Sequence, residues 1–419
     1  MPQAWSAYRH FAALDWAREA HVVVVVHQDG TRAATIKFDH SAEGWAHLRA
    51  QLAPFGPELP IAVETNQGPA VEQLLAAGCL VFPLNPKAAV RYRERKSPSG
   101  ASTDERDAWT MADALRTDGH GWRPLLPEDP LTAELRLLCR DEIGLIEQRT
   151  ALLLQLQQAL YDYYPAALEA FDHDLTLPAA WALIERFPTP QRLQDAGKRQ
   201  WEKFLHLHKL WRPQTIEKRL AIFARAASFG ATPATTAAKS LLAVSLARLL
   251  RTLEDQLTTY RQRIAELFAQ HPDHDLFGSL PGAGPKLAPR LLAELGAQRE
   301  RFPDAESLQL HAGTAPVPQQ SGKYNRPRFR QQCQKPLRAT LHLWAEQTTL
   351  RCTWAKAYYD THRKKGHGHA DTLRRLAHRW LKIVWKMWHS RAPYDEALHL
   401  QNQVKHGSWN LTLRVPAQA

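Results

Sequence analysis

Four acidic residues in the N-terminal third have the types and positions expected of a metal-dependent site. Asp15 and Glu64 each end an apolar run, in FAALD and IAVE, and a carboxylate there is costly to bury unless it is paired or metal-bound. Asp104 and Asp107 are three residues apart, so they share one face if the segment is helical. Hard divalent cations prefer oxygen ligands and polarise both the attacking and the leaving oxygen of a phosphodiester. The set therefore predicts a site that cuts DNA with Mg²⁺, two ions per site.

Each of these acids also has a simpler explanation. An Asp or Glu at a strand end is typical of a solvated turn, and two acids three residues apart are typical of a polar helix face. Asp113 lies farther along the same segment and is an alternative fourth member. We favour the metal site because all four acids fall at the positions that a single fold would bring together.

A second candidate for chemistry is Ser321, in the segment Gln319–Lys323, which precedes the basic string Asn325–Arg330. A serine beside a glycine and among cations can attack a phosphorus atom, because Lys and Arg stabilise the charge that develops there. The same composition is typical of an ordinary turn serine. From the residues alone, that simpler interpretation is favoured.

The distribution of charge predicts a polyanionic partner. The chain carries a net charge of +12. Residues 278–419 hold 23 Lys and Arg against 9 Asp and Glu, a net charge of +14, so residues 1–277 have a net charge of −2. The turn Pro281–Gly284 predicts a hairpin whose amides approach a phosphate, although an ordinary packing turn explains it equally well. The residues that we expect to contact nucleic acid are Gly282, Gly284, Lys286, Lys323, Arg326, Arg328, Arg330, Lys335, Arg338, Arg375 and Arg379.

Length and composition bound the class of protein. A chain of 419 residues predicts two or three folding units. With 44% hydrophobic and 23% charged residues and no long uncharged apolar stretch, a soluble protein without a membrane partner is expected. The N-terminal segment lacks the pattern of a secretory signal, so we expect a cytoplasmic protein. The four cysteines have neither disulfide nor zinc spacing and are expected to be reduced.

Strand and helix signals alternate over the first third of the chain. We expect strands at residues 11–16, at two runs within residues 21–40 that flank the turn pair Asp29–Gly30, and at residues 61–66 and 79–86. Helices are expected at residues 41–52, 69–77, 87–95 and 104–117, with Ser41 and Thr103 as N-caps. The order β-β-β-α-β-α-β-α is that of an RNase H-like domain.

The later part of the chain is predicted to be almost entirely helical. Heptad-like apolar patterns over residues 143–164 and 240–270 favour two long helices that pair as antiparallel coiled-coil arms. We therefore expect an α/β RNase H-like domain over residues 1–130, a helical coiled-coil region over 131–275, and a mainly α domain with a helix-hairpin-helix-like segment over 276–400. Residues 401–419 form a tail without a strong signal.

Five segments together resemble the insertion sequence 110 family of transposases. They are LDWA, AVETNQGPAVEQLLAAGCLVFPLNPKAAVRYRER, SGASTDERDAWTMADALRTD, LPGAGPKLAPRLLAELG and AGTAPVPQQSGK. Each motif is modest alone, but their order and spacing are specific. The resemblance covers both ends of the chain, whereas the middle region is similar only in its helical character.

The resemblance implies a transposase that exchanges DNA strands in bacterial cytoplasm, associated with the nucleoid when active. In proteins similar to this one, a RuvC-like DEDD domain would hold Mg²⁺ with Asp15, Glu64, Asp104 and Asp107. A coiled-coil region would dimerise, and Ser321 of a C-terminal transposase domain would become covalently linked to a DNA end. The family's guide is a structured bridge RNA that pairs with donor and target DNA, and assemblies from dimers to tetramers are expected.

One feature departs from the family pattern. Similar proteins commonly place a Lys just before the Ser or Thr that precedes the third acid, whereas here Ser102 precedes Thr103. A cation that contacts the substrate is therefore either missing or supplied by Lys96.

Two rival interpretations stay open from the sequence. A junction-resolving or structure-selective endonuclease would use the same four acids to hydrolyse DNA with water and would not need Ser321. A non-catalytic protein would only bind nucleic acid through its basic C-terminal part. The presence of all four acids counts against the second rival.

Overall fold

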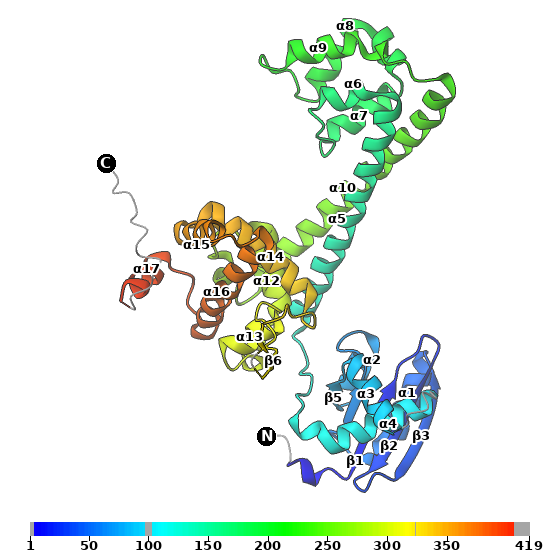
Figure 1. Ribbon diagram of the computed structural model, residues 1–419. Helices are drawn as coiled ribbons and strands as arrows, with labels where there is room; N and C mark the ends of the chain where they lie inside the picture. The colour runs from blue at the N-terminus through cyan, green and yellow to red at the C-terminus, as the bar shows by residue number, and fades with distance from the viewer. Residues whose placement is uncertain (1–3, 97–102, 323, 406–419) are drawn as a thin grey trace. The chain divides into compact units, whose positions relative to one another are not determined.

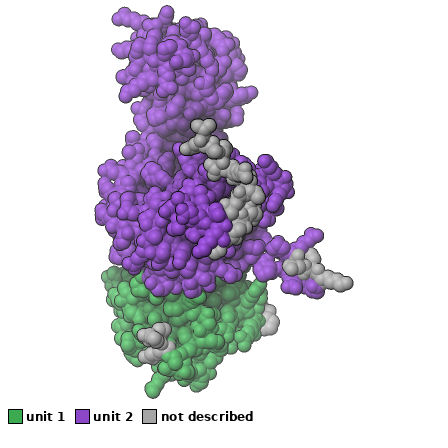
Figure 2. Space-filling model, turned by 90° about the vertical axis from the view of Figure 1, so that its left-hand side faces the viewer, with its two compact units in different colours: residues 1–127 green, residues 128–419 purple. Residues whose placement is uncertain are grey.

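The computed structural model describes residues 4–96, 103–322 and 324–405. The chain divides into two compact units, residues 1–127 and residues 128–419, which are coloured separately in Figure 2. Each unit has buried hydrophobic cores of its own. The finer division at residues 130, 275 and 400 stays a prediction.

Unit 1 contains a five-stranded sheet in the order β3-β2-β1-β4-β5 (Figure 1). The first three strands form an antiparallel meander, and β1, β4 and β5 run parallel to one another. The turn between β2 and β3 contains Gly30 at a φ of 91°, a conformation that glycine adopts without steric cost. All five predicted strands are confirmed: β1 (His10–Asp15), β2 (Ala20–His27), β3 (Arg32–Asp39), β4 (Pro60–Val63) and β5 (Leu80–Pro83).

Helices cover both faces of this sheet. Because side chains alternate along a strand, Leu14 and Val23 contribute to the core beneath α1 and α2, whereas Ala13 and Val24 contribute to the core beneath α3 and α4. The side chains of Ser41 and Thr103 accept hydrogen bonds from backbone amides of α1 and α4, which confirms both predicted N-caps. The helices are α1 (Ala42–Leu52), α2 (Pro69–Ala76), α3 (Pro86–Lys96) and α4 (Asp104–Asp118).

Unit 2 is organised around two long helices, α5 (Pro130–Tyr163) and α10 (Pro233–Gln270). Both begin earlier than predicted, because Asp129 and Thr232 cap them and a proline occupies the first turn of each. Ion pairs that join them run in opposite directions along the two helices, so the packing is antiparallel: Glu134–Arg263, Arg149–Glu254 and Asp162–Lys239.

A helical lobe packs on one end of this helix pair (Figure 1). Trp181, Phe204 and Phe223 are buried in this lobe, and Leu160 of α5 and Leu246 of α10 complete its core. The helical character predicted for this region is confirmed, and α8 contains a kink at Gly197, where φ is 73°. The helices are α6 (Pro165–Ala170), α7 (Pro178–Arg186), α8 (Pro190–Leu207) and α9 (Ile216–Ala224).

A second lobe packs on the other end of the pair, around Leu135 of α5 and Leu267 of α10. The segment before α14 contains a short hairpin, β6 (Gln320–Ser321) and β7 (Tyr324–Asn325). The last helix continues to Lys405, so the predicted tail begins helical, and residues 406–419 lie outside the described part of the chain. The helices are α11 (His274–Gly278), α12 (Gly284–Leu295), α13 (Ala305–His311), α14 (Lys335–Arg351), α15 (Thr353–Lys364), α16 (His369–Ser390) and α17 (Glu396–Lys405).

Short 3₁₀ helices occur at several connections. They are η1 (Trp5–Ala7), η2 (Ala53–Phe55), η3 (Gly119–Gly121), η4 (Ala226–Ser228) and η5 (Arg299–Arg301). Within the described residues, none of the helices is both long enough and apolar enough to cross a membrane.

A buried ion-pair network joins the long helices to the second lobe and yields a stability prediction. Glu142 of α5 is 2% exposed and lies 2.7 Å from Arg290 of α12 and 3.3 Å from Arg261 of α10. Glu142→Ala would leave the buried Arg290 guanidinium without this carboxylate, so we expect the free energy of unfolding to fall by about 3–5 kcal/mol. Urea unfolding followed by circular dichroism measures the change.

The matched control is Glu134→Ala, which removes the exposed partner of Arg263 on the same helix pair. This substitution should cost at most about 1 kcal/mol, because water screens an exposed pair. Equal losses for the two variants would show that Glu142 contributes nothing through its burial.

Candidate functional site

The carboxyl edge of the sheet in unit 1 brings the first two candidate acids together. β1 and β4 are parallel neighbours, and the last pair in register is Leu14 with Val63. The next residues along the two strands are Asp15 and Glu64, so both lie at the same edge. By the alternation of side chains they share the face of Ala13 and Ala62, which is covered by α3 and α4.

Helix α4 brings the other two acids to this face. Thr103 caps its start, which fixes Asp104 and Asp107 in the first turn. Burial, followed by the negative charges of Asp104, Asp107 and Glu64, raises the pKa of Asp15 to about 6. Since charges act on one another at this strength only over short distances in a protein, the four acids form one electrostatic cluster, here called the acid cluster.

Arg93 of α3 is a fifth member of this site. Its Nε lies 2.6 Å from Oδ1 of Asp107, a residue that is 9% exposed. Burial raises the pKa of Glu64, Arg93 opposes that shift, and Asp107 adds to it. The positive charge of Arg93 therefore offsets part of the repulsion among the carboxylates.

Asp113, the alternative fourth acid, belongs to a different network. It lies 2.5 Å from Nζ of Lys96 and 2.6 Å from Nη2 of Arg116. Burial opposes its ionisation, but these hydrogen bonds outweigh burial and hold the pKa of Asp113 below its usual value. Lys96 is thus engaged by Asp113 and also lies over the ring of Trp109, while Ser102 lies outside the described residues.

The acid cluster suits a divalent cation in composition, since hard cations take oxygen ligands and four mutually repelling carboxylates gain from a positive charge between them. In the described parts of the chain, however, no three His, Cys, Asp or Glu side chains lie close enough to hold one ion directly. The ion pair of Arg93 with Asp107 occupies part of the ligand set that a metal would use. The assignment of Mg²⁺ and of two ions stays a prediction.

Ser321 lies at the end of β6, one residue before the turn of the β6–β7 hairpin. It is exposed, it pairs with Tyr324 across the hairpin, and Gly322 in the turn has a φ of 55°. A side chain at this tip is open to an incoming strand. Lys323 lies outside the described residues.

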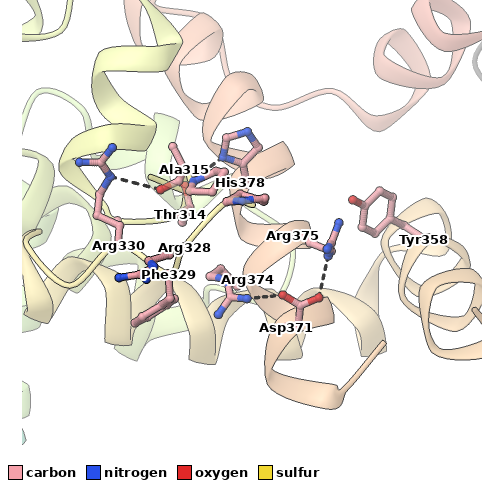
Figure 3. Close-up of a pocket in the computed structure, with 13 residues that line it drawn as sticks. Thr314, Ala315, Arg328, Phe329, Arg330, Tyr358, Asp371, Arg374, Arg375 and His378 are labelled. Carbon is pink, nitrogen blue, oxygen red and sulfur yellow. Dashed lines mark hydrogen bonds and ion pairs between the residues drawn. The ribbon is translucent and has the colours of Figure 1, made fainter. Parts of the chain in front are cut away.

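Several of the basic residues predicted to bind nucleic acid line a pocket that includes the segment after this hairpin. Arg328, Arg330 and Arg375 line one pocket of about 370 Å³ (Figure 3). Arg338 lies over the ring of Phe329, which also lines the pocket, and Arg379 lies over the ring of the lining residue Tyr358.

The other predicted contacts are spread over unit 2. Gly282 lies against α14, where a Cβ atom would come within 3.0 Å of the backbone carbonyl of Gln347. Its φ of 72° and its close approach to α14 therefore serve packing. Gly284 and Lys286 are exposed at the start of α12, Lys335 is exposed at the start of α14, and Arg326 is exposed after β7.

Sequence reasoning missed three residues that shape these sites: Arg93, Asp371 and Arg374. Arg93 gave no local signal, because its partner Asp107 is distant in sequence. Asp371 pairs with Arg374 and Arg375 at the i,i+3 and i,i+4 spacings of a helix. Charge patterning would therefore have identified Asp371 and Arg374.

Two protein families match the chain. Residues 12–165 match a family described as a transposase, the DEDD domain of IS110 elements. Residues 274–360 match the transposase IS116/IS110/IS902 family. The first match spans all four acids of the cluster, and the second spans the β6–β7 hairpin.

Similar proteins extend over most of the chain. The mini-circle putative transposase for IS117 of Streptomyces coelicolor is 32% identical over 394 residues, which are 92% of this chain and 95% of that protein. The insertion element IS900 uncharacterized 42 kDa protein of Mycobacterium paratuberculosis is 28% identical over 92% of this chain and 97% of its own length. The insertion element IS110 uncharacterized 43.6 kDa protein of Streptomyces coelicolor is 29% identical over 77% of this chain and 79% of its own length.

The raised pKa of Asp15 predicts how the stability of unit 1 depends on pH. Folding raises this pKa from 3.8 to about 6, so ionised Asp15 is disfavoured in the folded state, and stability is lost as the pH rises through that range. In a buffer with a chelator, Asp15→Asn should therefore exceed the wild type in free energy of unfolding by about 1 kcal/mol near pH 8, allowing for solvent screening. Near pH 3, below the unfolded pKa, the two proteins should be equally stable.

Asp29→Asn is the control, because hydrogen bonds from Thr31 lower the pKa of this exposed turn residue. It should give no gain at the higher pH. Urea unfolding monitored by tryptophan fluorescence measures both variants. An Asp15→Asn protein no more stable than the wild type near pH 8 would contradict the electrostatic account of the cluster.

Proposed function

This chain belongs to the IS110 family of transposases, and on that premise we propose that it cuts, exchanges and rejoins DNA strands through a covalent serine–DNA intermediate. As a transposase it is an enzyme that recombines DNA for insertion-sequence mobility. The observation that carries the proposal is the combination, in one chain, of an acid cluster with an exposed serine on a hairpin that precedes an arginine-rich segment.

The sheet of unit 1 supports an RNase H-like, RuvC-like assignment. Its antiparallel meander continues into two parallel strands, and two helices cover each face. In an RNase H-like domain, acidic residues at the carboxyl ends of neighbouring parallel strands face a helix that also carries acidic residues. The positions of Asp15, Glu64 and α4 support this arrangement.

In this proposal Asp15, Glu64, Asp104 and Asp107 hold Mg²⁺. The bound metal would supply Lewis-acid polarisation of the phosphate and charge for the leaving oxygen. Arg93 is the internal counter-ion in the structure, since it already pairs with Asp107. Releasing Asp107 would complete the ligand set and would leave the Arg93 guanidinium free to contact a phosphate oxygen.

Ser321 is the proposed nucleophile. Its Oγ attacks a DNA phosphorus atom, so that an Oγ–P bond forms and the bond from phosphorus to the leaving deoxyribose oxygen breaks. The hydroxyl proton of Ser321 is lost and the leaving oxygen gains a proton. The phosphodiester energy is kept in the serine–DNA bond, and attack by another strand's hydroxyl reverses the step without a high-energy cofactor. The exposed tip position of Ser321 supports this role.

Guidance by a bridge RNA and assembly into dimers or tetramers are parts of the same proposal. The charge of residues 278–419, 23 Lys and Arg against 9 Asp and Glu, suits a protein that holds several nucleic-acid strands. Sequence would then be selected by base pairing rather than by side chains. Sequencing the RNA that copurifies with the protein tests this part, and bulk cellular RNA in place of one structured species would contradict it.

Replacing the serine separates this proposal from the rival endonuclease. Ser321→Ala should abolish the covalent protein–DNA adduct and strand exchange, because no other group would form the Oγ–P bond. The adduct is measured by denaturing gel electrophoresis with labelled DNA. Asp15→Ala should abolish cleavage as well, since it removes a member of the metal site.

A junction endonuclease would give a different pattern. It would retain full cleavage in Ser321→Ala and would lose it only in Asp15→Ala, with no adduct in either protein. Ser240→Ala, which removes a hydroxyl from α10, is the control and should leave the adduct unchanged.

A further inference from the structure

A cavity in the second lobe of unit 2 collects more positive charge than its own carboxylate balances. It lies between the turn at residues 313–316, the segment Pro327–Arg330 that follows the hairpin, and the N-terminal half of α16 (Figure 3). Four arginines and a histidine line it with a single acid: Arg328, Arg330, Arg374, Arg375, His378 and Asp371. This set is here called the arginine pocket.

Most of these cations are held in place by the protein itself. Nε of Arg330 donates to the carbonyl oxygen of Ala315 at 3.2 Å, and Nε of Arg375 lies 2.7 Å from Asp371. Arg374 also pairs with Asp371, and its guanidinium lies 4.8 Å from the centre of the Phe329 ring. A binding site whose cations are fixed in advance loses little entropy when an anion enters.

Arg328 differs from its neighbours. Its backbone pairs with Val317, but within the described part of the chain no hydrogen bond or ion pair of its guanidinium is found. Its side chain is exposed at the wall of the pocket. A planar guanidinium in this position can make two parallel hydrogen bonds to a phosphate.

The pocket is connected directly to the proposed nucleophile. Ser321 pairs with Tyr324, Gln320 pairs with Asn325, and the ladder continues down to the bridge between Val317 and Arg328. Ser321 is four positions along the chain from Val317, and at about 3.3 Å per residue the distance along the strand is about 13 Å. A backbone phosphate held in the pocket would therefore lie only a few nucleotides from the attacked phosphorus.

We propose that the arginine pocket binds one backbone phosphate, with its sugar, of the DNA strand that Ser321 attacks, within a few nucleotides of the attacked phosphorus. Its volume of about 370 Å³ is near the lower end of the range for small-ligand pockets, about 300–1,000 Å³, and suits one nucleotide unit rather than a helix. Holding the strand here would set the register of the phosphate that meets Ser321. This inference rests on the proposed role of Ser321.

The test is binding of a 12-nucleotide single-stranded DNA of mixed sequence to the full chain, measured by fluorescence anisotropy over a range of salt concentrations. Arg328→Ala should weaken binding by about tenfold, the loss of one charge-assisted contact, and should reduce the slope of log affinity against log salt by about 0.7. Arg328→Lys should keep the salt slope and lose part of the affinity. Lysine retains the positive charge but lacks the planar guanidinium that makes two parallel hydrogen bonds. Circular dichroism verifies that both variants fold.

Arg199→Ala, which removes an exposed guanidinium from α8, is the matched control for net charge. Ethylation interference by gel shift then identifies the phosphate: ethylating one position should weaken binding to the wild type and have no further effect on Arg328→Ala. These measurements use binding, so Ser321→Ala protein should give the same result. A failure of the serine mechanism is thereby distinguished from a failure of the pocket.

Two results would overturn the proposal. One is an Arg328→Ala protein whose affinity and salt slope equal those of the Arg199→Ala control. The other is a loss confined to a 12-nucleotide RNA of the same sequence, which would assign the pocket to an RNA strand instead of the DNA strand.

Discussion

The parallel pairing of β1 with β4 is the constraint on which the acid cluster depends. It sets Asp15 and Glu64 side by side at one edge of the sheet, and strand alternation turns both toward α3 and α4. Carboxylates so placed repel one another, and this repulsion adds to burial, the larger cause, in raising the pKa of Asp15. Arg93 offsets it in part by pairing with Asp107. The fold therefore holds mutually repelling carboxylates close together, and a cation would be bound most favourably at this place.

In the proposed mechanism the two units would divide the chemistry between them. Unit 1 concentrates negative charge on a rigid sheet edge, whereas the second lobe of unit 2 concentrates positive charge around a short hairpin and a pocket. The long helices α5 and α10 support that lobe through the buried contact between Glu142 and Arg290. A phosphate needs both kinds of environment during strand transfer, because its oxygens must be neutralised and its phosphorus must meet a positioned nucleophile.

Much of unit 1 could be predicted from the sequence, because period-2 apolar runs, a turn pair and the caps Ser41 and Thr103 are local signals. The helix starts at Pro130 and Pro233 were missed, since apolar periodicity marks the buried stretch and says little about a polar first turn. The hairpin that carries Ser321 has strands of only two residues, too short for any periodicity. The Arg93–Asp107 pair and the arginine pocket are tertiary, so they depend on packing between segments that share no local pattern.

We propose that Asp15, Glu64, Asp104 and Asp107 act as one divalent-cation site. It is tested most directly by counting the Mn²⁺ ions that the full chain removes from solution, using the electron paramagnetic resonance signal of free Mn²⁺. The account predicts one or two bound ions per chain for the wild type and loss of binding in both Asp15→Asn and Glu64→Gln, with Asp29→Asn unchanged. Wild-type binding retained in Asp15→Asn would contradict it.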